Sequence, residues 1–283
     1  MNYILADGKL LPSDQPLITV DNHGYRYGNG LFETMKVVNG QICLAALHFD
    51  RFFAGMKTLQ WRTPAHLDAA TLQSQILQLC TKNNCSQLAR VRLSATCGQG
   101  GLNDGDHTFH YFIECWPAPD TVNQLNENGL VIGVYPDAIK SCDAFSHLKS
   151  ANFLPYLMAA RYAKANQWND ALVLNQHDRI ADSSIANLFI ISGNDIVTPA
   201  LTEGCVAGVM RQWLLEHLPA MGYQVEEGPL CIDDLLTADE LFLSNAMGIR
   251  WVKQFNTREY DNTKTIEIYK HIKPIWEKLV LPT

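Results

Sequence analysis

Two tight-turn signals near the start of the chain constrain the fold most. Asp7-Gly8 and Asn39-Gly40 are each flanked by apolar runs. Such dipeptides favour two-residue hairpins, because both central residues of the turn need a positive φ. Each turn therefore predicts that the run before it pairs with the run after it: residues 3–5 with 9–11, and residues 34–38 with 41–44. The chain is expected to open as antiparallel sheet.

Hydrophobic periodicity predicts the remaining elements. Apolar residues recur at helical spacing over 46–59 and again at Leu72, Ile76 and Leu79. A polar, proline-bearing segment then separates two domains, 1–118 and 129–283. We expect strands at 89–95, 109–116, 130–135, 170–174, 188–191, 196–199 and 240–248, and helices at 153–166, after 203–211 and over 265–278. Residues 179–187 are expected to form a loop of small residues that leads into the strand at 188–191. The first domain is predicted to be α+β.

Composition narrows the functional class. Hydrophobic residues make up 47% of the 283 residues and the net charge is −7, which fits a soluble protein with a real core and disfavours nucleic-acid binding. The N-terminal residues lack a signal-peptide pattern, and no apolar run approaches the length of a membrane span. The eight cysteines form no C-x-x-C pair and the histidines form no H-E-x-x-H motif. We therefore expect free thiols in a reducing cytoplasm and no metal site.

Lys149 is the first candidate for chemistry. It stands alone among small and neutral residues in Ser146-His147-Leu148-Lys149-Ser150-Ala151-Asn152-Phe153, just before a predicted helix. We interpret it as a nucleophilic amine that carries a cofactor as a Schiff base.

Several segments that contain arginines or free backbone N–H groups could bind an anion, but each also has an ordinary structural explanation. Arg90 and Arg92 share one face of a predicted strand, so they either hold an anion or face solvent. Arg51 flanks an apolar helix stripe, where arginine usually lies on a solvated edge. The small residues of 203–211 either leave helix N–H groups for an anion or only allow tight packing, and residues 244–248 form a second small polar turn. The glycine-rich segment 21–34 is either a site or a loop before a strand.

Taken in order, these segments resemble the class IV aminotransferases, the fold-type-IV pyridoxal-phosphate (PLP) enzymes. This group includes branched-chain aminotransferases, D-amino-acid aminotransferases and aminodeoxychorismate lyases. The matching segments are Tyr27-Gly28-Asn29-Gly30-Leu31-Phe32-Glu33, His48-Phe49-Asp50-Arg51, Leu148-Lys149-Ser150-Ala151-Asn152, Ile180-Ala181-Asp182-Ser183-Ser184-Ile185-Ala186-Asn187-Leu188-Phe189, Gly208-Val209-Met210-Arg211 and Leu243-Ser244-Asn245-Ala246. The resemblance implies a two-domain fold like that of D-amino-acid aminotransferase, with an N-terminal α+β domain and a C-terminal α/β barrel-like domain. It also implies that PLP lies between the domains and that the protein is a homodimer.

The resemblance also implies residue roles. Lys149 would hold PLP and move a proton, and Arg51 would bind its phosphate. The backbone at Val209, Met210, Asn245 and Ala246 would complete the phosphate site. Asp182 would partner the pyridine nitrogen, at a position where the family normally has glutamate. Phe32, Arg26, Arg90 and Arg92 are the substrate-binding candidates.

The substrate stays open between two reactions. The leading prediction is transfer of an amino group between a small amino acid, branched-chain or D-configured, and a 2-oxo acid. The alternative is 4-amino-4-deoxychorismate lyase, which releases pyruvate and p-aminobenzoate. Phe153 stands where branched-chain enzymes usually have tyrosine, and the glycine turn at 98–101 resembles that of the lyases without its accompanying arginine. A third reading is a cofactor-binding protein without turnover, against which intact Lys149 and Arg51 argue.

Overall fold

The computed structural model describes residues 2–103 and 105–278, which form two compact units. Of these residues, the first unit comprises 2–103, 105–120, 148–152 and 276–278, and the second comprises Thr121–His147 and Phe153–Ile275. The sequence division put the Lys149 stretch in the second domain. In the structure this stretch belongs to the first unit, so the chain returns to that unit for five residues.

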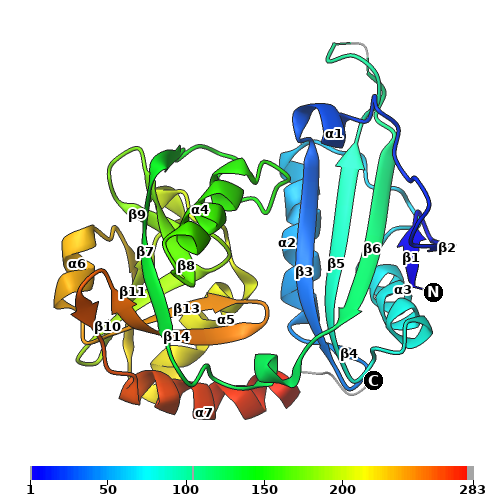
Figure 1. Cartoon of the computed structure of the whole chain (residues 1–283). Coiled ribbons are helices and arrows are strands. Elements are labelled where there is room, and N and C mark those ends of the chain that lie inside the picture. The colour runs from blue at the N-terminus through cyan, green and yellow to red at the C-terminus, as the bar shows by residue number, and fades with distance from the viewer. Residues whose placement is uncertain (1, 104, 279–283) are drawn as a thin grey trace. The chain divides into compact units, whose positions relative to one another are not determined.

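The first unit is an antiparallel six-stranded sheet in the order β2-β1-β6-β5-β3-β4, with α2 and α3 packed against it (Figure 1). Its elements are β1 (Tyr3–Ala6), β2 (Lys9–Pro12), α1 (His23–Tyr27), β3 (Gly30–Val38), β4 (Gln41–Ile42), α2 (Ala45–Thr58), α3 (Ala69–Lys82), β5 (Leu88–Cys97) and β6 (Phe109–Pro117). The segment 21–34, predicted as turn-rich, contains α1 and the start of β3.

Both predicted hairpins are confirmed. Ala6 pairs with Lys9 and Val38 pairs with Gln41, so each turn has two residues. All four turn residues have positive φ, from 49° at Asp7 and Asn39 to 80° at Gly8. The strand β4 is shorter than predicted, because Leu44 adopts a left-handed φ of 54° and turns the chain into α2.

The core of the first unit lies between the sheet and the two helices. The predicted stripes of α2 and α3 face inward: Phe52, Met56, Leu72, Ile76 and Leu79 are buried. Each such side chain contributes about 2 kcal/mol of burial free energy. This core fixes α2 against β3, which is what positions the side chains described below.

The second unit is a curled, mixed sheet in the order β12-β11-β10-β13-β14-β7-β8-β9, with β15 paired to β14. Pairs β11–β12, β14–β7 and β7–β8 are parallel and the other pairs are antiparallel. Its elements are η1 (Asp120–Asn123), β7 (Leu130–Lys140), α4 (Leu154–Ala165), β8 (Asp170–Asn175), β9 (Ile180–Ser183), β10 (Asn187–Ser192), β11 (Asp195–Pro199), η2 (Leu201–Glu203), α5 (Val209–His217), η3 (Leu218–Met221), β12 (Gln224–Gly228), α6 (Ile232–Thr237), β13 (Glu240–Asn245), β14 (Gly248–Phe255), β15 (Arg258–Glu259) and α7 (Thr263–Lys278).

One prediction in this unit needs correction. Residues 179–187 were expected to be a loop, but Ile180–Ser183 form β9, in which Asp182 pairs with Val173 of β8. All four residues of β9 are buried, so the strand shows no alternation of polar and apolar residues. The small polar residues there are buried at a site and do not mark a surface turn.

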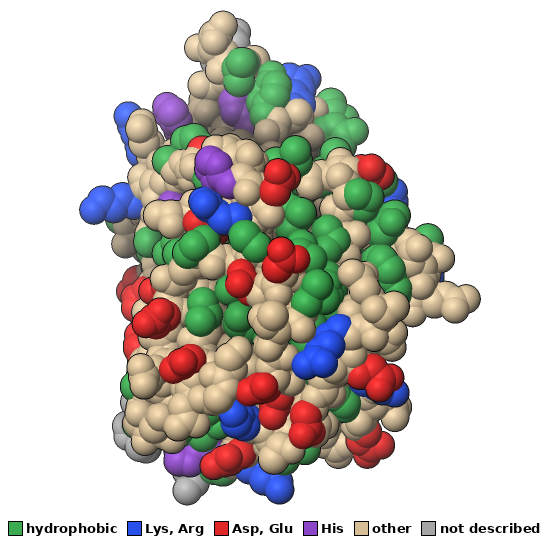
Figure 2. Space-filling model, turned by 90° about the vertical axis from the view of Figure 1, so that its left-hand side faces the viewer, with side chains coloured by type: hydrophobic (Ala, Val, Ile, Leu, Met, Phe, Trp, Pro, Cys, Tyr) green, Lys and Arg blue, Asp and Glu red, His purple; other side chains and the backbone are tan. Residues whose placement is uncertain are grey.

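The distribution of charged side chains on the surface agrees with the net charge of −7. On the face shown in Figure 2, acidic side chains are scattered among basic ones and no continuous basic field appears. Among the residues that the structure describes, no helix is both long and apolar enough to cross a bilayer.

Candidate functional site

In the first unit, Lys149 is anchored by its own backbone to the start of β3. The Phe32 amide donates to the Lys149 carbonyl at 2.9 Å, and the Ala151 amide donates to the Gly30 carbonyl at 2.8 Å. Ser150 forms an isolated antiparallel bridge with Leu31. A segment far from β3 in sequence is thus held beside it as a short extra strand. These bonds fix the backbone from which the half-buried Lys149 side chain extends.

Gly28 fits the same segment closely. It has a φ of 70°, and a Cβ placed there would lie 2.3 Å from the side-chain oxygen of Asn152. No larger residue fits in that space, and the backbone conformation itself favours glycine. The glycine-rich segment and the lysine stretch, which are separate in the sequence, therefore form one structural feature.

Arg51 is oriented by a buried carboxylate. Its Nε donates to Glu33 Oε1 at 2.7 Å and its Nη2 donates to Glu33 Oε2 at 2.5 Å. His48 Nδ1 lies 2.6 Å from the same Oε2. Burial by itself raises the pKa of Glu33, but the charge of Arg51 and the His48 hydrogen bond outweigh it and hold that pKa at about 2. Glu33 is therefore ionised and holds the Arg51 fork in one orientation.

His48 completes this group as a neutral imidazole donor. Its burial lowers its pKa, and the charges of Arg51 and Lys149 lower it further, against the opposing effect of Glu33. Lys149 and Arg51, predicted separately from sequence, are both attached to the start of β3, because the Lys149 carbonyl accepts from the Phe32 amide and the Arg51 side chain donates to the next residue, Glu33.

Two cations of the same unit lie over the ring of Phe32. The Arg92 guanidinium carbon is 3.9 Å from the centre of its ring, and the Lys149 Nζ is 4.7 Å from that centre. Arg92 Nε also donates to Ser94 Oγ at 3.1 Å, and burial lowers the pKa of Arg92. This arrangement places a guanidinium and an amine at one aromatic ring, where cations are attracted to the ring face.

The other two predicted arginines are placed differently. Arg90 is exposed on the same face of β5 as Arg92, as the alternation predicted. Arg26 is also exposed, and it donates to the carbonyls of Val20 at 3.0 Å and Gly100 at 2.9 Å. Those bonds connect α1 to the loop after β5.

In the second unit, one carboxylate oxygen of Asp182 accepts hydrogen bonds and the other has no donor among the described residues. Its Oδ2 accepts from the Val206 amide at 2.9 Å and from the Tyr156 hydroxyl at 3.0 Å, and Lys140 Nζ lies 3.4 Å away. Lys140 also bonds the Tyr156 hydroxyl. Asp182 Oδ1 is buried and has no hydrogen-bond partner among the described residues. A buried carboxylate oxygen without a donor is costly, so this atom points to a missing N–H or O–H group.

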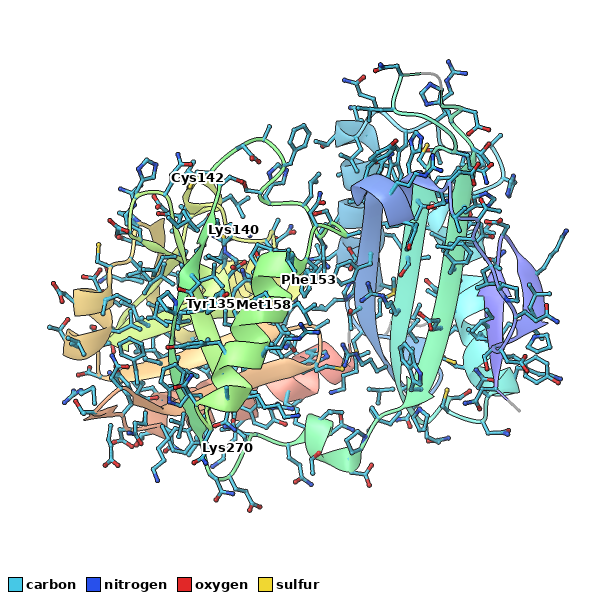
Figure 3. The ribbon with its side chains drawn as sticks, turned by 45° about the horizontal axis from the view of Figure 1, so that its top comes forward. Tyr135, Lys140, Cys142, Phe153, Met158 and Lys270 are labelled. Atoms are coloured by element: carbon cyan, nitrogen blue, oxygen red, sulfur yellow. The ribbon has the colours of Figure 1, made fainter. Side chains whose placement is uncertain are left out.

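Tyr156 is fixed as a donor. Burial and the neighbouring Asp182 charge raise its pKa well above the usual value for tyrosine, so it keeps its proton. Phe153 packs on its ring at 4.7 Å between centroids. Figure 3 shows Phe153 just before α4 and Lys140 at the end of β7.

The start of α5 is shaped for close backbone approach. Gly208 precedes the helix, and a Cβ there would lie 1.9 Å from the side-chain oxygen of Asn187. The helix has no side-chain cap at its N-terminus. The first N–H groups of a helix, here those of Val209 and Met210, have no carbonyl within the helix to bond. They form a natural anion site once a ligand is present.

The turn between β13 and β14 offers a second set of polar groups. Asn245 pairs with Gly248, so Ala246 and Met247 form a two-residue turn. The Met247 amide is bonded to Asn245 Oδ1 at 2.9 Å. Next to this turn, the hydroxyl oxygen of Ser244 is buried without a partner among the described residues. The sequence prediction named Asn245 and Ala246 but not Ser244.

Comparison with known proteins identifies the family. The model of the class IV aminotransferases matches residues 30–255. The chain belongs to the class IV aminotransferases. It is 27% identical to an aminodeoxychorismate lyase of Vibrio harveyi over 82% of this chain and 85% of that protein. It is 26% identical to a putative branched-chain-amino-acid aminotransferase of Methanocaldococcus jannaschii, over 95% and 93%.

The fold agrees with this family. A branched-chain aminotransferase of Thermoproteus uzoniensis superposes with a TM-score of 0.86, covering 99% of this chain and 94% of the other at 20% identity. Class IV aminotransferases are PLP enzymes, so PLP is the cofactor of this protein. The predicted family, fold class and cofactor are confirmed.

The residues present fit PLP. The unmatched Asp182 Oδ1 suits a protonated pyridine nitrogen, which would supply the missing donor. Arg51, held by Glu33, and the uncapped start of α5 suit a phosphate.

Sequence reasoning missed the groups that support these residues. Glu33, His48, Lys140 and Tyr156 hold the named side chains in place, but none was given a role from sequence. Glu33 carried a usable signal, because a lone glutamate follows a glycine-rich segment inside an otherwise apolar strand.

Proposed function

We propose that this protein is a PLP-dependent aminotransferase that moves an amino group between a small amino acid and a 2-oxo acid. The observation that supports it most directly is the approach of the Lys149 amine and the Arg92 guanidinium to the ring of Phe32. An amino acid presents a carboxylate to bind and an α-proton to move, and this pair supplies one group for each task.

Each residue has a definite task in this proposal. PLP, when bound, supplies an electron sink for the bonds at the α-carbon of the substrate. Lys149 Nζ holds the cofactor and carries the proton. In the first unit, Arg51 is the proposed phosphate-binding side chain. In the second unit, the amides of Val209, Met210 and Ala246 and the polar groups of Asn245 are the proposed phosphate donors. Asp182 Oδ1 accepts from the pyridine nitrogen, while Tyr156 and Lys140 fix its other oxygen.

Replacing Asp182 by asparagine tests the pyridine partner. The amide has nearly the same shape but cannot stabilise a proton on the ring nitrogen. We expect kcat to fall on the order of 10²-fold, because an electrostatic group aimed at the reacting system is lost. PLP should still attach to Lys149, which borohydride reduction and peptide mapping measure. Asp178→Asn, at an exposed turn position with a left-handed φ of 56°, is the control. Full activity of Asp182→Asn would contradict the proposed role of Asp182 as the partner of the pyridine nitrogen.

Replacing Arg92 by alanine tests the substrate carboxylate site. We expect KM for amino donor and 2-oxo acid to rise roughly 10- to 100-fold, since a charge-assisted hydrogen bond contributes about 1.5–3 kcal/mol. The same change at exposed Arg90 should have a smaller effect, because solvent screens its charge. Exposed Arg62→Ala is the control. Unchanged KM values in the Arg92 variant would contradict this assignment.

A donor screen tests the function itself. L- and D-amino acids are supplied one at a time to the PLP-loaded protein, and conversion of the bound cofactor to its amine form is followed by its absorbance. At least one small amino acid should convert the cofactor, and a 2-oxo acid should restore it. An inert spectrum with every donor would refute the aminotransferase proposal.

The second candidate is 4-amino-4-deoxychorismate lyase, which the similarity to the Vibrio harveyi lyase favours. Its substrate also carries carboxylates, so the Arg92–Phe32–Lys149 arrangement fits it too. Release of pyruvate and p-aminobenzoate, with no half-reaction from any amino acid, would establish the lyase in place of the aminotransferase.

The proposal includes a homodimer in the cytoplasm. Apart from Cys43, the cysteines are free thiols in the part of the chain that the structure describes, which suits a reducing compartment. Light scattering of the purified protein gives the assembly state.

A further inference from the structure

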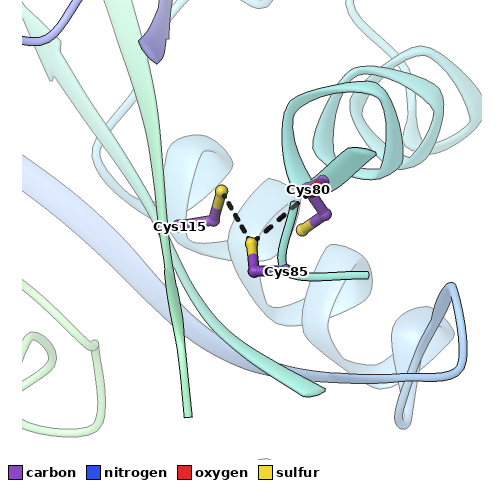
Figure 4. Close-up of side chains that lie close together, drawn as sticks. All are labelled: Cys80, Cys85 and Cys115. Atoms are coloured by element: carbon purple, nitrogen blue, oxygen red, sulfur yellow. Dashed lines mark hydrogen bonds between the residues drawn. The ribbon is translucent and has the colours of Figure 1, made fainter. Parts of the chain in front are cut away.

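Three cysteines of the first unit converge in a place that the proposed reaction does not use. The Sγ atoms of Cys80, Cys85 and Cys115 all lie within 4.8 Å of one another, and Figure 4 shows them between the end of α3 and β6. The Cys85 and Cys115 sulfurs are 3.5 Å apart. All three residues are buried. This group could not be predicted from the sequence, because Cys115 is thirty positions beyond Cys85 and no C-x-x-C pair is present.

Local structure brings the first two thiols together. Cys80 lies in the last turn of α3, which ends at Lys82. Asn84 then adopts a left-handed φ of 56°, a conformation that asparagine tolerates better than most residues. The chain turns back, and the Cys85 amide donates to the Cys80 carbonyl at 2.9 Å. Both thiols are thereby directed to the same side of the turn.

The sheet supplies the third thiol. Cys115 is on β6 opposite Val91 of β5, on the face that packs against the helices. The Asn83 side-chain amide donates to Cys115 Sγ at 3.3 Å and to the Tyr3 carbonyl at 2.8 Å. Asn83 Oδ1 accepts from the Tyr3 amide at 2.9 Å. This asparagine thus connects the cysteine group to β1 and presents an N–H donor to a sulfur.

The spacing of the sulfurs matches that of metal ligands. With metal–sulfur bonds of about 2.3 Å, ligand sulfurs are separated by about 3.8–4.0 Å in tetrahedral or trigonal geometry. The observed group, at 3.5 Å for one pair and no more than 4.8 Å for any pair, surrounds such a position with small side-chain shifts. An outer N–H donor to a ligand sulfur, as Asn83 provides, is the usual support of metal-bound thiolates.

We propose that Cys80, Cys85 and Cys115 bind one thiophilic metal ion, Cu(I) or Zn(II), through three thiolates. Soft sulfur ligands select these ions. Within the described part of the chain, no fourth His, Cys, Asp or Glu joins the group. Cu(I) is satisfied by the three sulfurs, whereas Zn(II) takes a water or another exogenous ligand as its fourth. Binding releases the thiol protons, one for each thiolate formed from a protonated cysteine. The site lies outside the proposed reaction and does not depend on it.

The test uses the reduced, full-length, PLP-loaded protein under anaerobic conditions. Cu(I) and Zn(II) are titrated separately against chromophoric chelators, and Cd(II) serves as a probe through its thiolate absorption. We expect one equivalent of metal per chain. Affinity should fall at least about 100-fold in Cys85→Ser and in Cys115→Ser, since each removes a ligand. A higher affinity for Cu(I) than for Zn(II) identifies the trigonal site, and the reverse order identifies zinc with its added ligand.

Two controls keep the test decisive. Cys97→Ser changes another buried thiol of the same sheet and should bind metal like the wild-type protein. In the wild-type protein, bound metal should protect these three cysteines from alkylation, as measured by peptide mapping, which requires no variant to fold. The proposal is overturned if no metal binds under these conditions, if binding persists in both serine variants, or if alkylation of the three cysteines is unaffected by the metal.

Discussion

Lys149→Ala is expected to abolish turnover, with kcat at least about 10⁴-fold below wild type. A positioned proton-transfer group contributes up to about this factor, and here the same amine also holds the cofactor. In wild-type protein treated with borohydride, the cofactor should be found on the peptide that contains Lys149. The measurement is single-turnover kinetics with the best donor from the screen, combined with that peptide map.

Lys149→Arg tests whether position 149 needs only a positive charge or an amine that can attach PLP and release a proton. Arginine keeps a cation near the Phe32 ring but cannot attach PLP or give up its proton near neutral pH. It should be as inactive as the alanine variant. Lys164→Ala, at an exposed position of α4, is the matched control and should behave like wild type. Retention of more than a hundredth of the activity in Lys149→Arg would show that Lys149 acts only through its charge.

The order of elements could be predicted from sequence because local signals and the fold agree. The two hairpins follow from turn residues that accept positive φ, and α2 and α3 follow from apolar stripes that are buried as expected. Where a strand is buried on both faces, its sequence no longer alternates between polar and apolar residues. That is why β9, which carries Asp182, was interpreted as a loop.

Single residues of the candidate site could be predicted from the sequence, but the contacts among them could not. Lys149, Arg51 and Asp182 follow from motifs, but their supporting partners depend on pairings between distant segments. Glu33 meets Arg51 because β3 packs on α2, and Asp182 meets Tyr156 because β9 and α4 both lie against β8. The Cys80–Cys85–Cys115 group shows the same limit, since a helix end, a turn and a distant strand form it together.

Glu33→Gln is expected to destabilise the protein by about 3 kcal/mol at neutral pH. The folded state holds the pKa of Glu33 at about 2, against a usual value of 4.5, and each unit is worth about 1.4 kcal/mol. Because the folded pKa is the lower one, this stabilisation is present above pH 4.5 and is lost as the pH falls toward 2. The variant should therefore differ most from wild type at pH 5–7 and converge with it near pH 2–3. Urea unfolding across this pH range measures the difference.

The same variant links stability to cofactor binding. Without the carboxylate, Arg51 loses the partner that orients its fork, so PLP affinity should fall together with stability. Asp50→Asn changes an exposed carboxylate on the same helix and should alter neither property. If Glu33→Gln loses the same free energy at pH 3 as at pH 7, the effect comes from altered packing and not from the ion pair. In the double variant Glu33→Gln/Arg51→Met, the second substitution should cost much less stability than it does alone, because it then leaves no buried Glu33 carboxylate without its cationic partner.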